Sequence, residues 1–108
     1  MIVTLSATAS LGLAAASAYS APKTVLVVGD SLSAEYGLTR GAGWVALLEQ
    51  KLKAQKIDAT IVNASISGET TSGGRARLPA LLNAHKPDVV VIELGANDGL
   101  RGLPVDAA

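Results

Sequence analysis

Apolar residues in this chain gather into short blocks that alternate between the spacing of strands and the spacing of helices. Residues 25–28 are a continuous apolar run that ends at Gly29, as in a strand buried on both faces. Residues 59–62 form a second short run, and residues 88–94 (DVVVIEL) form a third that ends at Gly95. The pattern therefore predicts three strands.

Apolar residues between the first two predicted strands have the spacing of a helix. From residue 44 to residue 56, apolar side chains recur at positions 44, 47, 48 and 52, which share one helical face. Glu49 and Lys53 form a favourable i,i+4 pair on the polar side. We expect an amphipathic helix here, with Trp44 in the core rather than on the surface.

A second helix is predicted between the second and third strands. Ser72 is its expected N-cap, and the helix is expected to run to about His85. Pro79 lies inside it and predicts a kink or a restart. The resulting order β-α-β-α-β implies right-handed crossovers and a parallel α/β sheet.

Residues 1–20 differ from the rest, because none of the 9 basic or 9 acidic residues lies among them. The segment has an apolar centre at 11–16, and two small-x-small triplets follow it, at 16–18 and 18–20. This composition is typical of a signal peptide, although no basic residue precedes Lys23. A membrane anchor is the alternative, and the many Ser, Thr and Gly residues disfavour it. We expect export to the periplasm or secretion, with no stable membrane insertion after cleavage, and a folded domain over 21–108.

Charge and composition exclude several classes of function. The formal net charge is zero, so the chain lacks the clustered positive field of a nucleic-acid-binding module. It has no cysteine and a single histidine, His85, which excludes a disulfide framework, a thiolate nucleophile and a Cys- or His-based metal site. We therefore expect no metal and no cofactor.

Small polar residues and glycines follow each predicted strand. The three segments are Gly29-Asp30-Ser31-Leu32-Ser33, residues 63–70 (NASISGET) and Gly95-Ala96-Asn97-Asp98. In open parallel sheets, reactive groups collect in the loops beyond the carboxyl ends of the strands. We therefore expect these three loops to converge on one site, with a nucleophile and hydrogen-bond donors as its parts.

These three segments resemble the sequence blocks of the SGNH or GDSL hydrolases, in particular the bacterial periplasmic thioesterase I, lysophospholipase and arylesterase group. The resemblance runs from about Thr24 to Leu103 and is carried by the Gly29–Ser33 block, by Gly68 in the second loop and by Gly95-Ala96-Asn97-Asp98. It implies a three-layer α/β/α flavodoxin-like fold, of which this chain contains the first three strands.

The resemblance assigns Ser31 as the nucleophile of a serine esterase. It assigns the oxyanion hole to the backbone N–H groups of Ser31 and Gly68 and to the side-chain amide of Asn97. Donors already aimed at the developing negative charge stabilise it without reorganisation. Glycine permits close backbone approach, and an amide donates without titrating. Tyr36, in the glycine-rich loop after Ser31, is a candidate for the acyl pocket.

A serine hydroxyl needs a base, and His85 does not fit this role. It precedes the third strand whereas Ser31 follows the first, and a strand of about six residues at ~3.3 Å each separates them by roughly 20 Å. The family's catalytic Asp and His lie in a later Asp-x-x-His block that does not occur before Ala108. We expect residues 21–108 to be the N-terminal part of the hydrolase domain, inactive without that block.

Other polar residues near the loops have simpler interpretations. Asp30 is expected to hydrogen-bond loop backbone. Glu69 and Asp98 are expected to be loop charges, and the arginines at 75, 77 and 101 are expected to form a solvated face.

The predicted function is hydrolysis of small-molecule carboxylic esters and thioesters, such as aryl esters, acyl thioesters or lysophospholipids, through an acyl-enzyme. The main alternative is a catalytically inactive fragment or binding module of the same fold. Nucleotide binding by the loop over 35–43 is disfavoured, because no phosphate-binding glycine motif with its lysine is present. The sequence makes no prediction of oligomeric state.

Overall fold

The computed structural model of this chain describes residues 2–3, 22–104 and 106. The predicted signal peptide, apart from Ile2 and Val3, lies outside the described residues. No helix among the described residues has the length and apolar character needed to cross a membrane.

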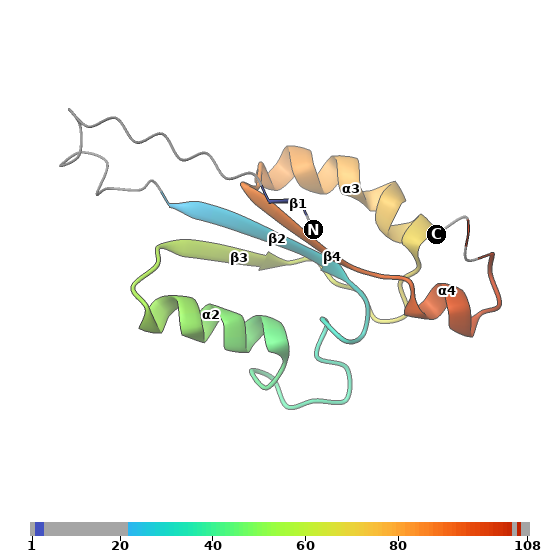
Figure 1. The fold of residues 1–108 in the computed structure, drawn as a ribbon, viewed down its shortest axis with the longest axis horizontal. Helices are drawn as coiled ribbons and strands as arrows, with labels where there is room; N and C mark the ends of the chain where they lie inside the picture. Colours follow the sequence, from blue (N-terminus) through green and yellow to red (C-terminus); the bar gives the residue numbers. More distant parts are fainter. Residues whose placement is uncertain (1, 4–21, 105, 107–108) are drawn as a thin grey trace.

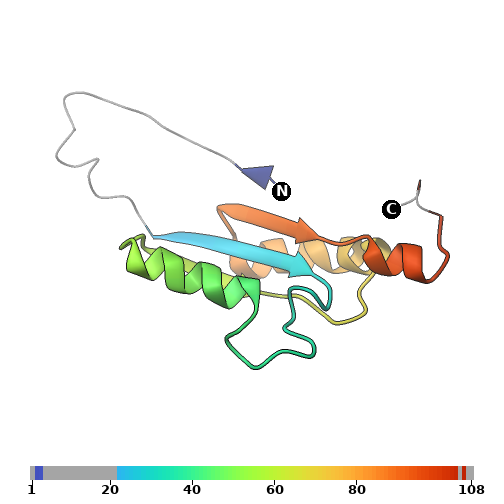
Figure 2. The same ribbon diagram turned by 60° about the horizontal axis from the view of Figure 1, so that its bottom comes forward.

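A four-stranded sheet forms the centre of the fold, in the order β1-β4-β2-β3. Strands β2 (Lys23–Gly29), β3 (Ala59–Asn63) and β4 (Val89–Glu93) are parallel, with β2 in the middle. The two-residue strand β1 (Ile2–Val3) pairs antiparallel with β4. β2 and β4 run side by side and end at the same edge of the sheet (Figure 2). The predicted parallel α/β sheet is confirmed.

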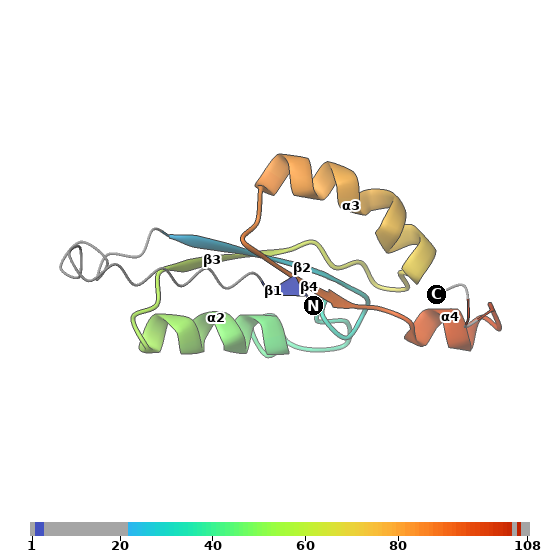
Figure 3. The same ribbon diagram turned by 45° about the horizontal axis from the view of Figure 1, so that its top comes forward.

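Helices cover both faces of this sheet. Helix α2 (Trp44–Ala54) lies on one face and α3 (Thr71–His85) on the other, which gives the expected three layers (Figure 3). A short helix, α4 (Ala96–Leu100), follows β4 directly (Figure 1). The continuous burial of Leu26, Val27 and Val28, none more than 1% exposed, follows from this arrangement because β2 has neighbours on both faces.

The expected N-cap of α3 is wrong. Its N-cap is Thr70, not Ser72: the Thr70 backbone is extended, and its hydroxyl accepts a hydrogen bond from the Gly73 N–H at 3.2 Å. Of the kink or restart expected at Pro79, the helix shows no restart, and its ribbon bends along its length (Figures 1 and 3). Pro79 and Arg75 are both exposed, so water can reach the Arg75 carbonyl that loses its helical partner.

The apolar face of α2 is rotated from the predicted one. Val45 is the buried residue of this helix, and the half-buried Leu48 and Leu52 follow it at i+3 and i+7. Trp44 is 36% exposed and Leu47 is 53% exposed, so both lie at the rim of the buried stripe. The expectation of a core Trp44 is wrong, and its indole N–H has a polar role described below.

Candidate active site

The loop after β2 turns sharply at Asp30, and Ser31 lies half-buried in this turn. The Asp30 carboxylate accepts a hydrogen bond from the Leu32 N–H at 3.0 Å. The Asp30 carbonyl accepts from the N–H groups of Ser33 and Ala34 at 3.1 and 2.9 Å. Asp30 therefore shapes the turn that presents Ser31, which confirms its predicted structural role.

Gly29 allows this turn to pack against the neighbouring strand. A Cβ at this position would lie 2.6 Å from the Ser33 Oγ and 2.9 Å from a carboxylate oxygen of Glu93, both below van der Waals contact. Any larger residue would push apart the end of β2 and the end of β4. The close packing of the two strand ends therefore requires glycine at position 29.

The second loop is joined to the first by its backbone. The Ile66 N–H donates to the Gly29 carbonyl at 3.0 Å, which continues the β2–β3 pairing past the ends of the strands. Two residues later, Gly68 adopts a φ of 85°, in the left-handed region that favours glycine. The turn containing Gly68 therefore lies at the same sheet edge as Ser31.

The third loop is joined to the second by two side chains. The Asn97 amide donates to the Glu69 carbonyl at 3.0 Å, and the Arg101 guanidinium donates to the Gly68 carbonyl at 2.7 Å. A side-chain amide carries two N–H groups, so Asn97 keeps a second donor beyond this contact. The structure thus brings the loops of Ser31, Gly68 and Asn97 to one edge, as the sequence predicted for the loops.

Asp98 and Glu69 are not merely loop charges. Asp98 is 4% exposed and accepts from the Thr71 N–H at 2.9 Å and from the Thr71 hydroxyl at 2.6 Å. These two hydrogen bonds hold the pKa of the Asp98 carboxyl below its ordinary value. Glu69 pairs with Arg77 at 2.9 Å, so Arg77 is also not part of a solvated face. Both carboxylates connect α3 to the site loops.

We expect Asp98→Asn to lower the midpoint of thermal unfolding by a few degrees near neutral pH, because an amide is a weaker acceptor for the two Thr71 donors. Since the folded-state pKa of Asp98 is depressed, its contribution is complete above its ordinary pKa of 3.8 and is lost as the pH falls through the lower folded-state value. Thermal melts of both proteins at several pH values check this. The difference between them should shrink only below about pH 3.8. A difference that persists in strong acid would contradict the assignment.

Glu93 is a residue of the site that sequence reasoning did not single out. It ends β4, and one carboxylate oxygen accepts from the Ser33 hydroxyl at 2.8 Å and, at a longer 3.4 Å, from the Asp30 N–H. Burial raises the pKa of the Glu93 carboxyl, and the nearby Asp30 carboxylate also raises it. The available signal was a single acidic residue inside the otherwise apolar run 89–94.

Tyr36 and His85 take no part in the hydrogen bonds that join the three loops. Tyr36 is 75% exposed, and its backbone N–H donates to the Ser31 carbonyl at 3.3 Å. Its role in the acyl pocket stays a prediction. His85 is the last residue of α3 and is exposed. Helix α3 ends beside the start of β4, at the opposite end of the sheet from the site loops (Figure 1).

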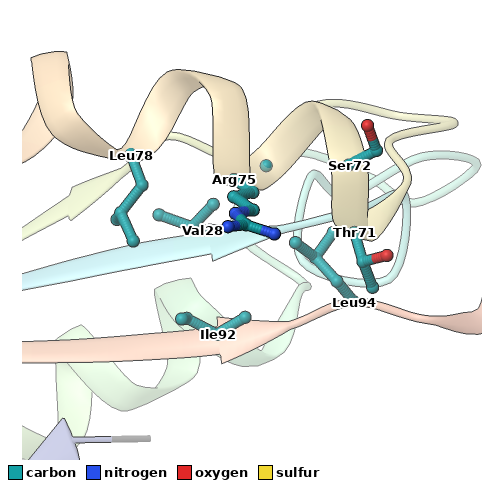
Figure 4. Close-up of a pocket in the computed structure, with 8 residues that line it drawn as sticks. Val28, Thr71, Ser72, Arg75, Leu78, Ile92 and Leu94 are labelled. Atoms are coloured by element: carbon teal, nitrogen blue, oxygen red, sulfur yellow. The ribbon is translucent and has the colours of Figure 1, made fainter. Parts of the chain in front are cut away.

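A cavity of about 550 Å³ lies elsewhere, between α3 and strands β2 and β4. Side chains of Val28, Leu78 and Ile92 extend into the space beneath the helix, with Arg75 beside them (Figure 4). Ser31, Gly68 and Asn97 are not among its lining residues. This mainly apolar hollow is therefore separate from the candidate active site.

The sheet order and the two-sided helix cover define a protein of the flavodoxin-like α/β class, in which the three candidate site loops meet at one edge of the sheet. The GDSL-like Lipase/Acylhydrolase family matches residues 27–108. The chain belongs to this family.

Named relatives agree with this assignment. The chain is similar to "Esterase TesA" of Pseudomonas aeruginosa, with 61% identity over 83 residues that cover 77% of this chain and 41% of the relative. It is 54% identical to "Thioesterase 1/protease 1/lysophospholipase L1" of Escherichia coli K12 over 82 residues, which cover 76% of this chain and 38% of the relative. The crystal structure of the psychrotrophic esterase EstA from Pseudoalteromonas sp. matches with a TM-score of 0.73 and 55% identity, covering 79% of this chain and 46% of that one. The chain thus spans about two fifths of the length of these curated relatives.

Proposed function

We propose that the full-length protein is a serine esterase that hydrolyses carboxylic esters and thioesters through an acyl-enzyme on Ser31. The observation that carries the proposal is the joining of three loops at one sheet edge, through the Ile66–Gly29 and Asn97–Glu69 hydrogen bonds. A nucleophile and amide donors at one edge suit acyl transfer, in which negative charge develops on the carbonyl oxygen. The names of the relatives, esterase and thioesterase, support the same reaction class.

In this mechanism the Ser31 hydroxyl attacks the carbonyl carbon, and the leaving alcohol or thiol departs with a proton. The backbone N–H groups of Ser31 and Gly68 and the amide of Asn97 hold the tetrahedral oxyanion. A general base accepts the Ser31 proton and later activates the water that releases the acid. We propose that an Asp–His pair outside these 108 residues supplies the base, so that this chain alone is inactive.

Exposed apolar side chains on the site loops favour substrates with an apolar acyl group. Leu32 and Tyr36 lie on the first loop at 65% and 75% exposure, and Leu100 lies in α4 at 84%. A hydrocarbon chain that covered them would gain the usual free energy of apolar burial. We therefore propose aryl esters, acyl thioesters and lysophospholipids as the substrate classes, with the protein in the periplasm or secreted.

A serine-directed phosphonate tests the proposal. EstA from Pseudoalteromonas sp. is described as inhibited by monoethylphosphonate, and we expect the same chemistry at Ser31. The full-length protein should hydrolyse a p-nitrophenyl ester and an acyl thioester, and a phosphonate should abolish both activities. Peptide mass spectrometry should then find one phosphonyl group on the peptide that contains Ser31. Hydrolysis that resists the reagent, or a label on another residue, would overturn the proposal.

A further inference from the structure

The strand end next to Ser31 holds a polar cluster formed by the buried Asp30 and Ser33, the half-buried Glu93 and Trp44 at the rim. Asp30 and Ser33 are each only 1% exposed. The Ser33 hydroxyl donates to Glu93 at 2.8 Å and accepts from the Trp44 indole N–H at 2.9 Å. The Ser33 carbonyl accepts from the Asn63 amide at 2.8 Å. Ser33 is therefore fixed from β4, α2 and β3 at once.

Glu93 contacts the nucleophile loop on both sides of Ser31. Its carboxylate oxygen accepts from the Asp30 N–H, one residue before Ser31, and from the Ser33 hydroxyl, two residues after it. Glu93 pairs in register with Gly29 at the end of the β2–β4 ladder, so its backbone is held by the sheet itself. A rigid strand end thus anchors the short segment that carries Ser31.

We propose that Glu93 is a positioning residue, which holds the segment from Asp30 to Ser33 so that the Ser31 hydroxyl keeps its attack geometry. This inference rests on the proposed function. Glu93 does not touch the reacting atoms in this proposal. It acts through Ser33, and removing its carboxylate would leave the buried Ser33 hydroxyl without an acceptor.

Charge distinguishes two substitutions of Glu93. The other charged group of the cluster is Asp30, whose second carboxylate oxygen is buried and has no hydrogen-bond partner among the described residues. Glutamine at position 93 would keep an acceptor oxygen for Ser33, and its amide N–H would be a favourable neighbour for Asp30. Alanine would provide neither. The positioning role therefore predicts that Glu93→Gln retains activity and Glu93→Ala loses it.

The expected loss appears in kcat rather than in KM. Misplacement of a reacting group by about 1 Å can cost on the order of 100-fold in rate. We expect Glu93→Ala to lower kcat by roughly 10- to 100-fold with little change in KM, since the Ser31 loop would be loosened without removal of a substrate contact. Ser33→Ala should show the same pattern.

The experiment compares Glu93→Ala, Glu93→Gln, Ser33→Ala and the double variant Glu93→Ala/Ser33→Ala in the full-length protein. Glu49→Ala is the matched control, because Glu49 lies on α2 and its one ion pair among the described residues is with Lys53 on the same helix. If Glu93 acts through Ser33, the double variant should lose little more than the more impaired single variant. Wild-type kcat in Glu93→Ala, or additive losses in the double variant, would overturn the proposal. If Glu93→Ala does not fold, Ser33→Ala decides by the same criterion on kcat.

Amide hydrogen exchange separates this proposal from the proposed function. Glu93→Ala should speed exchange in the peptide over residues 30–36 and leave the peptide over residues 76–85 of α3 unchanged, whether or not the protein hydrolyses esters. Faster exchange there in a protein without esterase activity would mean that the proposed function fails while the positioning role stands. Unchanged exchange there would overturn the positioning role itself.

Discussion

Replacement of Ser31 by alanine is expected to abolish ester and thioester hydrolysis by the full-length protein, with kcat falling by roughly 10⁴- to 10⁶-fold. Without the hydroxyl no acyl-enzyme can form, and only slow direct attack by water remains. The fold should be unaffected. The turn around Ser31 is held by Asp30 and Ser33, and the Ser31 side chain makes no hydrogen bond to another described residue. Initial rates on both substrate classes, together with a thermal melt, check this prediction.

Ser72→Ala is the matched control for this substitution. Ser72 is an exposed serine in the first turn of α3. It lines the separate cavity and does not belong to the three site loops. Its replacement should leave kcat and KM at wild-type values. Turnover by a Ser31→Ala protein purified from a host that lacks endogenous esterases would show that another group performs the attack.

The sheet could be predicted because buried parallel strands leave a local signal in the sequence. Residues 25–28 are apolar at every position, since β2 is covered on both faces, and Gly29 ends the run where the chain must turn. The convergence of the three loops follows from topology alone, because parallel strands end at one edge. The strands and the convergence of their loops therefore depend little on specific side-chain contacts between distant residues.

Contacts between distant residues left weaker signals. Glu93 meets Ser33 across 60 positions of sequence, and nothing local to either residue specifies that hydrogen bond. Thr and Ser are both good N-cap residues, so the sequence alone did not distinguish Thr70 from Ser72. The extended backbone at residue 70 makes Thr70 the N-cap of α3. Helical spacing predicted that Trp44 lies in the core, but Trp44 lies at the rim, where its indole N–H donates to the buried Ser33 hydroxyl. Apolar periodicity can be recognised in the sequence, whereas the hydrogen-bond partner of a polar side chain depends on the assembled fold.

Asn97→Ala is expected to lower kcat by roughly 100- to 1000-fold, the usual consequence of losing one oxyanion donor. KM should change much less, because the lost hydrogen bond strengthens only as negative charge develops on the substrate oxygen. The Asn97 amide also donates to the Glu69 carbonyl, so a modest decrease in the thermal midpoint is expected as well. Full kinetic curves for wild type and variant, with melts on the same preparations, separate the two effects.

Asn97→Asp sharpens this test, because aspartate has the shape of asparagine but no N–H donor when ionised. It would place negative charge next to the developing oxyanion and next to the Glu69 carbonyl, so its kcat should fall at least as far as that of Asn97→Ala. Asn83→Ala, at an exposed position near the end of α3, is the control and should behave as wild type. An increase in KM at unchanged kcat would assign Asn97 to substrate binding. A loss of stability with kcat intact would assign it to joining the second and third loops, and Ser31 and Gly68 would then be left to stabilise the oxyanion alone.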